Sequence, residues 1–385
     1  MHVTPYAVSV PDAALADLQH RLEWTRFPDE AQDAGWDYGT NLGYLRDLVT
    51  YWRHTFDWRA QERCINTFAH FRAELDGLGI HFVHARGHGP RPLPLLLVHG
   101  WPSSFYEMLD LIPYLTDPER FGGDPADAFD VVAVSLPSYG FSDRLTGSGM
   151  TSRAIGSLLV RLMDGLGYQR FGVHTYDIGA SIMTQACLHH PEHVIGYHTT
   201  EPGIPGPQAS SLEARPLTPE ERAYIEYRPQ WRQEEGGYMA ILSTRPQTLG
   251  YGLNDSPAGL AAWILEKWRA WTIQPGGTIE QHFTKDQLLT TVMIYWVTQT
   301  INAANRYYYR DKKPAPPQPQ ASTIDVPVGV ALTTQQIERA PRAYAERVFT
   351  DIRQWVDLGR GGHFLPLEEP RLLAAVLQQF FRLLR

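Results

Sequence analysis

The stretch from Phe171 to Ser181 constrains the fold of this chain more than any other. Its first residues close a short apolar run typical of a buried strand, and from Ile178 onward apolar residues recur at helical spacing. Between the two, Thr175-x-Asp177-x-Gly179 has the small-x-nucleophile-x-small pattern of a sharp strand-to-helix turn, which exposes its central side chain. Asp177 at that position predicts a carboxylate nucleophile whose covalent product would be an alkyl ester. The alternative for this stretch alone is an aspartate that only caps a helix.

The composition limits the class of protein. With 385 residues, 43% hydrophobic and 20% charged, the chain can bury the core of one large domain or two. The net charge of -8 argues against nucleic acid and anionic membrane as partners. Cys64 and Cys187 fit neither a metal motif nor a disulfide framework, and we find no leader peptide or membrane-length apolar run. We therefore expect a cytoplasmic protein without a metal, and the sequence leaves the oligomeric state open, with a homodimer as one option.

Residues 1–90 read as a lead-in region, followed by a regular alternation of strands and helices. The elements predicted in this region are a strand over 6–10, a helix capped by Asp12 with Leu15, Leu18 and Leu22 on one face, a helix from about 40, and a hairpin of strands 68–75 and 80–85. From residue 91 the alternation favours a parallel α/β sheet.

The alternation of strands and helices is interrupted between residues 206 and 322, where Pro and Gly are frequent and the clearly periodic segments have helical spacing. We expect a helical cap there, which divides the chain into 1–90, 91–205, 206–322 and 323–385. The strands predicted after residue 90 cover 93–98, 129–136, the run before Asp177, 193–199, 326–332 and 352–358, and the helices cover 105–112, 155–166, 260–271, 288–304 and 369–384.

His363 is the candidate base that would activate water against the ester. It lies in the glycine-rich segment 359–364, between the last predicted strand and the final helix and downstream of Asp177. This is the place and the chain order of the histidine in a nucleophile–base arrangement. The alternative is an ordinary core or surface histidine.

Two backbone N–H groups are the candidate donors to the oxyanion that forms on the ester. One belongs to Ile178, directly after the nucleophile, and the other to Trp101, directly after the first long strand. Gly100 would let that backbone approach closely. The remaining predicted wall of the substrate pocket consists of His99, Gly100, Pro102 and Tyr176.

Five motifs occur together along the chain. They are His99-Gly100-Trp101-Pro102, the Asp177 turn, and the segments 137–142, 253–260 and 360–364. In combination they resemble the α/β-hydrolase epoxide hydrolases of the microsomal and juvenile-hormone type, whose N-terminal extension residues 1–90 also resemble. Bacterial members that open epoxides in enediyne and polyketide pathways are similar. The resemblance implies an α/β-hydrolase fold and cofactor-independent hydrolysis of a small-molecule epoxide.

The resemblance further implies two tyrosines that hydrogen-bond the epoxide oxygen as the ring opens. Tyr238 matches the first and Tyr308 the second, with Tyr307 and Tyr309 as close neighbours in sequence. A phenol is a suitable donor to an oxygen that develops alkoxide character. The alternative is that these tyrosines only pack in the interior.

The chain departs from the family pattern at the turn and at the acid. Thr175-Tyr176 and Ile178 replace the family's Gly-Gly and Trp around the nucleophile. The position of the family's acid, after the penultimate strand, is Gln336. A glutamine cannot stabilise an imidazolium as a carboxylate does.

Glu201 is the preferred candidate for the missing acid. It follows the strand after the Asp177 helix, a spacing that resembles haloalkane dehalogenases with their acid after that strand. Glu338 is the alternative, and a third option is a His363 without a carboxylate partner. The predicted triad is therefore Asp177–His363–Glu201.

The predicted activity is conversion of an epoxide to a vicinal diol. The altered turn and Gln336 motivate an alternative, a rearrangement or C–C bond formation on a polyketide epoxide in secondary metabolism, such as antibiotic biosynthesis. Haloalkane dehalogenation and a non-catalytic binding role are further alternatives. A bulky apolar substrate is suggested by the aromatic residues of the predicted cap, which are Tyr224, Tyr227, Trp231, Trp263, Trp268 and Trp271.

Overall fold

A single nine-stranded sheet forms the centre of the computed structural model, which describes residues 1–147, 149–202, 215–272, 277–311, 323–335 and 339–385. The strand order is β1-β2-β3-β5-β4-β6-β7-β8-β9. The strands are β1 (His2–Tyr6), β2 (His70–Leu75), β3 (Leu78–Ala85), β4 (Leu93–Val98), β5 (Phe129–Val134), β6 (Phe171–Thr175), β7 (Val194–Thr199), β8 (Val328–Leu332) and β9 (Ile352–Asp357). The six strands from β5 to β9 in this order are parallel, whereas β1, β2 and β3 pair antiparallel.

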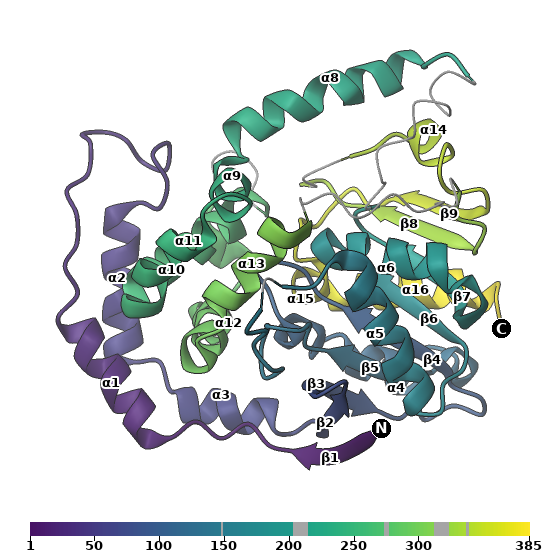
Figure 1. The fold of residues 1–385 in the computed structure, drawn as a ribbon, viewed down its shortest axis with the longest axis horizontal. Helices are drawn as coiled ribbons and strands as arrows, with labels where there is room; N and C mark the ends of the chain where they lie inside the picture. Colours follow the sequence, from purple (N-terminus) through teal and green to yellow (C-terminus); the bar gives the residue numbers. More distant parts are fainter. Residues whose placement is uncertain (148, 203–214, 273–276, 312–322, 336–338) are drawn as a thin grey trace.

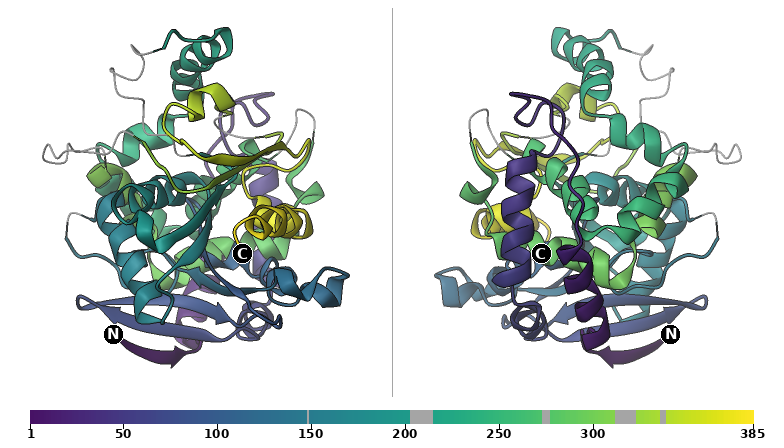
Figure 2. Two further views of the ribbon diagram at one scale, coloured as in Figure 1. Left: turned by 90° about the vertical axis from the view of Figure 1, so that its right-hand side faces the viewer. Right: turned by 90° about the vertical axis from the view of Figure 1, so that its left-hand side faces the viewer.

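The central strands are buried on both faces, as the continuous apolar sequence of β4 predicts. Residues 95–98 of β4 and 131–133 of β5 have no exposed surface. On one face, Phe380 of α16 (Pro370–Arg382) contacts the ring of His198. On the other, the hydroxyl of Tyr197 donates to the carbonyl of Ala180 in α6 (Asp177–His189). Figures 1 and 2 show the two helices on opposite sides of the sheet, with α5 (Ser152–Gly165) beside α6. The α/β-hydrolase architecture expected from the sequence is confirmed.

The region between β7 and β8 is helical where it is described. Its helices lie beside the sheet in Figure 1. They are α8 (Pro219–Glu234), α9 (Gly237–Leu242), α10 (Pro246–Asp255), α11 (Pro257–Ala270), α12 (Lys285–Thr298) and α13 (Ile301–Asp311), with the short 3-10 helix η5 (Ile279–Gln281) between α11 and α12. We call α8 to α13 the helical insert. Within the described part of the chain, no helix is both long and apolar enough to cross a membrane.

The N-terminal residues connect the sheet to the helical insert. β1 and the hairpin of β2 and β3 extend the sheet, while α1 (Asp12–Glu23), α2 (Leu42–His54) and α3 (Trp58–Ile65) run along the insert (Figure 1). Thr40 donates its hydroxyl to the carbonyl of Ala262 at 2.7 Å, and the Tyr51 hydroxyl donates to Asp286 at 2.9 Å. The lead-in region therefore holds the insert in place as well as extending the sheet.

Two predictions near the N-terminus are wrong. The first strand covers His2–Tyr6 instead of 6–10, because the backbone of Val8 bonds the side-chain amide of Asn66 at 2.9 and 2.8 Å and so leaves the sheet. Asp12 does not cap α1: the N-cap is Pro11, and the Asp12 carboxylate pairs with Arg59.

Two predicted helices are each divided in the structure. The segment 105–112 forms the 3-10 helix η1 (Phe105–Met108) and then α4 (Ile112–Thr116), because Pro113 has no N–H and cannot continue a preceding helix. The segment 288–304 is divided between α12 and α13, because Gln299 adopts a left-handed conformation with φ of 52°. The sequence pattern does not predict helices α3, α8, α9 and α10. The Lys- and Pro-rich segment 312–317, which we interpret from its sequence as a linker back to the sheet, lies outside the described residues.

Candidate active site

Asp177 lies at the junction of β6 and α6, where the chain turns sharply. Its φ is +52°, a left-handed conformation that a non-glycine residue adopts only when its surroundings impose it. The small residues of the turn are required by space: a Cβ on Gly179 would lie 2.4 Å from the Thr175 hydroxyl and 2.7 Å from the carbonyl of His99. The N-cap of α6 is Tyr176, so the geometry is that of a strained turn and not of a capping aspartate.

The Asp177 carboxylate is held by backbone donors. Its Oδ1 accepts the N–H of Trp101 at 2.8 Å, and the N–H of Ile178 also bonds the carboxylate. A Cβ on Gly100 would lie 2.4 Å from the Asp177 Cβ, so only glycine lets these two segments of the chain approach so closely. The N-terminus of α6 adds a favourable dipole for a negative charge.

His363 lies next to Asp177 in the segment between β9 and α15 (Leu365–Glu368). Its Nε2 is 3.6 Å from Oδ2 of Asp177, and its Nδ1 is 3.3 Å from Oε2 of Glu201. The exposed fractions of the three side chains are 1% for His363, 9% for Asp177 and 15% for Glu201. The structure therefore brings together the three residues of the predicted triad, with the imidazole between the two carboxylates.

Glu201 reaches His363 because it follows the end of β7. The Thr199 hydroxyl donates to the carbonyl of Glu201 at 2.7 Å and accepts its N–H at 3.0 Å, which folds the chain back toward the site. Gln336 and Glu338, the other candidates for this role, lie outside the described residues.

Burial governs the ionisation of the Asp177–His363 pair. It raises the pKa of Asp177 to about 6, with the charge of Glu201 adding to the increase and His363 and the two N–H donors opposing it. Burial also lowers the pKa of His363 to about 4, against the attraction of Asp177. At neutral pH the site therefore holds an ionised Asp177 and a neutral His363, the forms that a nucleophile and a general base require.

Aromatic rings form one wall of the site around Trp101. The ring of Tyr238 stacks on that of Trp101 with centroids 4.9 Å apart and an interplanar angle of 2°, and Tyr308 meets both rings edge-on at 5.9 Å. Tyr238 comes from α9 and Tyr308 from α13, so both belong to the helical insert. The indole N–H of Trp101 donates to Asn305 at 3.2 Å, which holds the ring against α13.

The neighbouring residues Tyr307 and Tyr308 of α13 differ in the contacts of their hydroxyl groups. The Tyr308 hydroxyl is buried without a hydrogen-bond partner among the described residues, and the charge of Asp177 contributes to its raised pKa. The Tyr307 hydroxyl is engaged with Ser152 at 2.8 Å. Of these two, Tyr308 is the one with a donor available to a ligand near Asp177.

The other residues predicted for the pocket have more structural contacts. The Nε2 of His99 accepts the N–H of Leu136 at 3.1 Å, and its Nδ1 therefore carries the proton and donates to the carbonyl of Gly100 at 2.9 Å. The carbonyl of Pro102 accepts the indole N–H of Trp268 at 3.2 Å. Tyr176 is buried with its ring edge-on to His363, at 5.2 Å between centroids.

The aromatic residues predicted to line a cap cavity divide into two groups. Trp271 contacts the rings of His363 and Tyr238 at 5.0 and 5.5 Å, and Trp263 contacts Trp101 at 6.3 Å. Tyr224 instead packs on Tyr344, outside this wall. Sequence reasoning did not single out Asn305 or the carbonyl of Trp271, which accepts the N–H of His363 at 2.9 Å. Neither contact has a local sequence signal, because each joins segments far apart in the chain.

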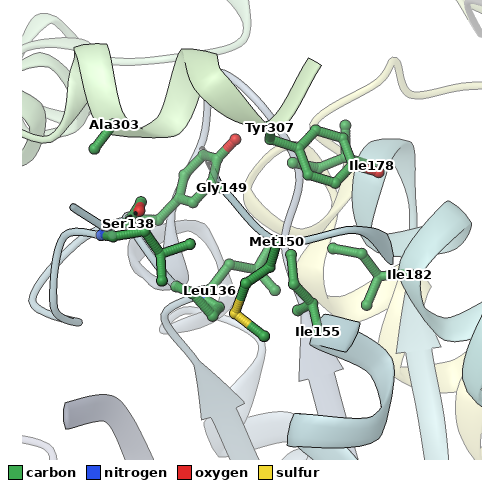
Figure 3. A pocket seen from close by; sticks show the side chains of 12 residues that line it. Leu136, Ser138, Gly149, Met150, Ile155, Ile178, Ile182, Ala303 and Tyr307 are labelled. Atoms are coloured by element: carbon green, nitrogen blue, oxygen red, sulfur yellow. Dashed lines mark hydrogen bonds between the residues drawn. The ribbon is translucent and has the colours of Figure 1, made fainter. Parts of the chain in front are cut away.

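A small apolar pocket, separate from the aromatic wall around Trp101, has Ile178 among its lining residues (Figure 3). Its walls come from the segment after β5, from α5 and α6, and from α13. The lining residues are Leu136, Pro137, Ser138, Tyr139, Leu145, Gly149, Met150, Ile155, Ile178, Ile182, Ala303 and Tyr307. The hydroxyls of Ser138 and Tyr307 are already bonded within the protein, so the pocket suits an apolar group.

Asp177, Glu201 and His363 are also the described residues that could together hold a metal ion, with one ligand atom from each lying within 4.8 Å of the others. However, His363 directs one ring nitrogen to each carboxylate. A single metal ion would use only one of these nitrogens, so the arrangement matches a proton relay better than a chelate.

The fold and the site define an α/β-hydrolase, and the family model for the alpha/beta hydrolase fold matches residues 94–238. A second model, epoxide hydrolase N terminus, matches residues 3–108. The chain belongs to the epoxide hydrolase family, which confirms the resemblance seen in the motifs. Epoxide hydrolase 1 of Sus scrofa is 35% identical over 99% of this chain and 89% of its own length. A protein of Stigmatella aurantiaca, whose name assigns it provisionally to the epoxide hydrolases, is 39% identical over 100% of this chain and 86% of its own.

Solved structures agree with this assignment. The crystal structure of juvenile hormone epoxide hydrolase from the silkworm Bombyx mori superimposes with a TM-score of 0.87 at 28% identity, covering 99% of this chain and 95% of its own. The Aspergillus niger epoxide hydrolase structure gives a TM-score of 0.85 at 25% identity, covering 100% of this chain and 97% of its own.

Proposed function

We propose that this protein hydrolyses an epoxide to a vicinal diol through an ester on Asp177. The observation that carries the proposal is the position of His363, which has the Asp177 carboxylate at 3.6 Å on one side and Glu201 at 3.3 Å on the other. Membership of the epoxide hydrolase family supports the reaction class.

In the first step, Oδ2 of Asp177 attacks a ring carbon while the C–O bond of the epoxide breaks. Oδ1 is bonded to the N–H of Trp101 and so is the less available oxygen. Tyr238 and Tyr308 donate hydrogen bonds to the ring oxygen as it develops alkoxide character, and one of them supplies its proton. The raised pKa of Tyr308, caused by burial, keeps that phenol protonated before the reaction.

In the second step, water hydrolyses the ester. His363 takes a proton from the water, whose oxygen attacks Cγ of Asp177, and the negative charge moves onto Oδ1. The N–H groups of Trp101 and Ile178 stabilise this oxyanion, because Trp101 already donates to Oδ1 and Ile178 donates to the same carboxylate. Collapse expels the product alkoxide, which takes the proton from His363 and leaves as the diol, and Glu201 stabilises the imidazolium in between. Asp177 is regenerated as a carboxylic acid that holds the second proton of the water, and transfer of this proton to the tyrosinate left by the first step restores the starting state.

The substrate has an apolar substituent in this proposal. The pocket beyond Ile178 is adjacent to the nucleophile in sequence and in space, and its lining is mostly aliphatic (Figure 3). On the other side, Trp263 and Trp271 extend the aromatic wall. We place a flat or aromatic group of the epoxide against the indoles, as in a bulky natural product, and the pocket admits only a small apolar group beside it.

A single turnover in ¹⁸O-labelled water tests the mechanism, with styrene oxide as the probe and enzyme in excess. We expect the first diol to carry unlabelled oxygen from Asp177 and the label to appear in the peptide that contains Asp177. Label in the first diol would show direct attack by water and would overturn the ester. A product isomeric with the epoxide, without added water, would favour the rearrangement alternative.

A further inference from the structure

The carboxyl group of Glu368 accepts hydrogen bonds from the backbone on both sides of His363. Glu368 is the last residue of α15, and its side chain is 1% exposed. Its Oε2 accepts the N–H of Gly362 at 2.8 Å, and its Oε1 accepts the N–H of Phe364 at 3.0 Å. One side chain thus fixes the peptide groups before and after the candidate base.

The remaining contacts of His363 make its ring position depend on this backbone. Its own N–H donates to the carbonyl of Trp271 at 2.9 Å, so three successive N–H groups are anchored. The imidazole packs edge-on against the rings of Trp271, Phe364 and Tyr176, with centroids 4.9–5.2 Å apart. A ring confined in this way cannot turn to compensate for a shift of the backbone, and its alignment with the ester is set by the anchored peptides.

The buried position of Glu368 costs folding free energy for any polar group that lacks hydrogen-bond partners there. Burial raises its pKa to about 8, and the two N–H donors oppose that increase. Glu107, fully buried on the neighbouring η1, has its pKa raised well above the usual range by burial, which disfavours a negative charge there. The other groups near Glu368 are His282, 3.7 Å from Oε2, and Glu369, which pairs with Arg360. An apolar residue here would leave two N–H groups unpaired, which also costs stability.

We propose that Glu368 is a positioning residue for ester hydrolysis: it holds His363 in line with the water that attacks the Asp177 ester. The inference rests on the proposed function. The first step uses Asp177, Tyr238 and Tyr308, whereas the carboxylate bonds of Glu368 lead to the backbone around His363. Loss of Glu368 should therefore slow the second step selectively.

The test is the Glu368→Gln variant with styrene oxide, quenched at intervals and measured by intact-protein mass. The amide keeps the shape but offers only one acceptor, so one flanking N–H loses its partner. A small misalignment of a catalytic group costs up to about 100-fold, and we expect ester hydrolysis to slow about 10- to 100-fold. Ester formation should change less than about threefold, so the alkylated enzyme accumulates. The first-order rate at which the ester decays does not depend on how much of the variant folds.

Two further variants separate the possible failures. Glu221→Gln removes another fully buried carboxylate, which lies outside the site and accepts a hydrogen bond from Arg347 at 2.6 Å. This variant should be less stable than wild type but should not accumulate ester. His363→Gln should accumulate ester if the proposed mechanism holds. Ester in His363→Gln but none in Glu368→Gln overturns the positioning role alone. No ester in either variant overturns the proposed mechanism, and equal slowing of both steps in Glu368→Gln reduces Glu368 to a structural residue.

Discussion

Nδ1 of His363 lies 3.3 Å from Oε2 of Glu201, although the whole helical insert lies between the two residues in the sequence. The contact is possible because β7 and β8 are parallel neighbours and β9 follows, so the segments after them meet at one edge of the sheet. The resemblance to the family implies Gln336 at the position of the acid, and we propose that Glu201 supplies the carboxylate instead.

The first prediction concerns that acid. Glu201→Gln should lower kcat by about 10²- to 10⁴-fold, because the imidazolium formed in the second step loses its counter-charge. Rapid-quench mass measurement should show the Asp177 ester accumulating. Glu338→Gln is the matched control and should keep wild-type turnover, while the opposite pattern would assign the acid to Glu338.

The second prediction concerns the donors to the epoxide oxygen. Tyr308→Phe and Tyr238→Phe should each slow ester formation about 10- to 1000-fold, because one hydrogen bond to a developing charge is lost. Pre-steady-state alkylation rates measure the effect directly. Tyr307→Phe is the control, since its hydroxyl is bonded to Ser152, and it should leave the alkylation rate within about threefold of wild type. A larger defect in Tyr307→Phe than in Tyr308→Phe would exchange their roles.

The third prediction is a pH dependence. Because burial raises the pKa of Asp177 to about 6, the nucleophile becomes protonated below that pH and kcat/KM should fall about tenfold per pH unit. The pKa of His363, lowered to about 4 by burial, keeps the base neutral throughout this range. Steady-state rates between pH 4.5 and 9 check the profile. An activity that stays flat down to pH 5 would contradict the raised pKa of Asp177.

The fourth prediction is that the nucleophile destabilises the protein. Native Asp177 binds its proton more tightly than the unfolded chain does, so folding stability is lost as pH rises from about 3.8 to about 6 and stays lower above that range. Asp177→Asn should therefore raise the free energy of unfolding at pH 7.5 by about 1–3 kcal/mol, since asparagine also tolerates a left-handed φ. Urea unfolding at pH 7.5 and near pH 4 should show the gain shrinking in acid. A variant less stable than wild type at pH 7.5 would refute this reading.

Local patterns account for much of the fold. The unbroken apolar run of β4 predicted a parallel strand buried on both faces, and the glycine-rich segment before His363 was predicted to lie between the last strand and the final helix. The errors arise where a distant contact overrides the local pattern. Val8 leaves the sheet because the side-chain amide of Asn66 hydrogen-bonds both its N–H and its carbonyl. The left-handed conformation of Gln299 ends a helix that apolar periodicity alone would continue.

The sequence by itself determined the succession of strands along the chain, the sharp turn at Asp177 and the family, because each of these signals comes from residues close together in the chain. The tertiary structure decided which carboxylate faces His363, which of the α13 tyrosines keeps a hydroxyl available, and that Glu368 holds the backbone around the base. These relationships join segments separated by long stretches of chain or depend on the direction in which a side chain points. Periodicity encodes which face of an element is apolar, but it does not encode which polar groups meet when those faces pack.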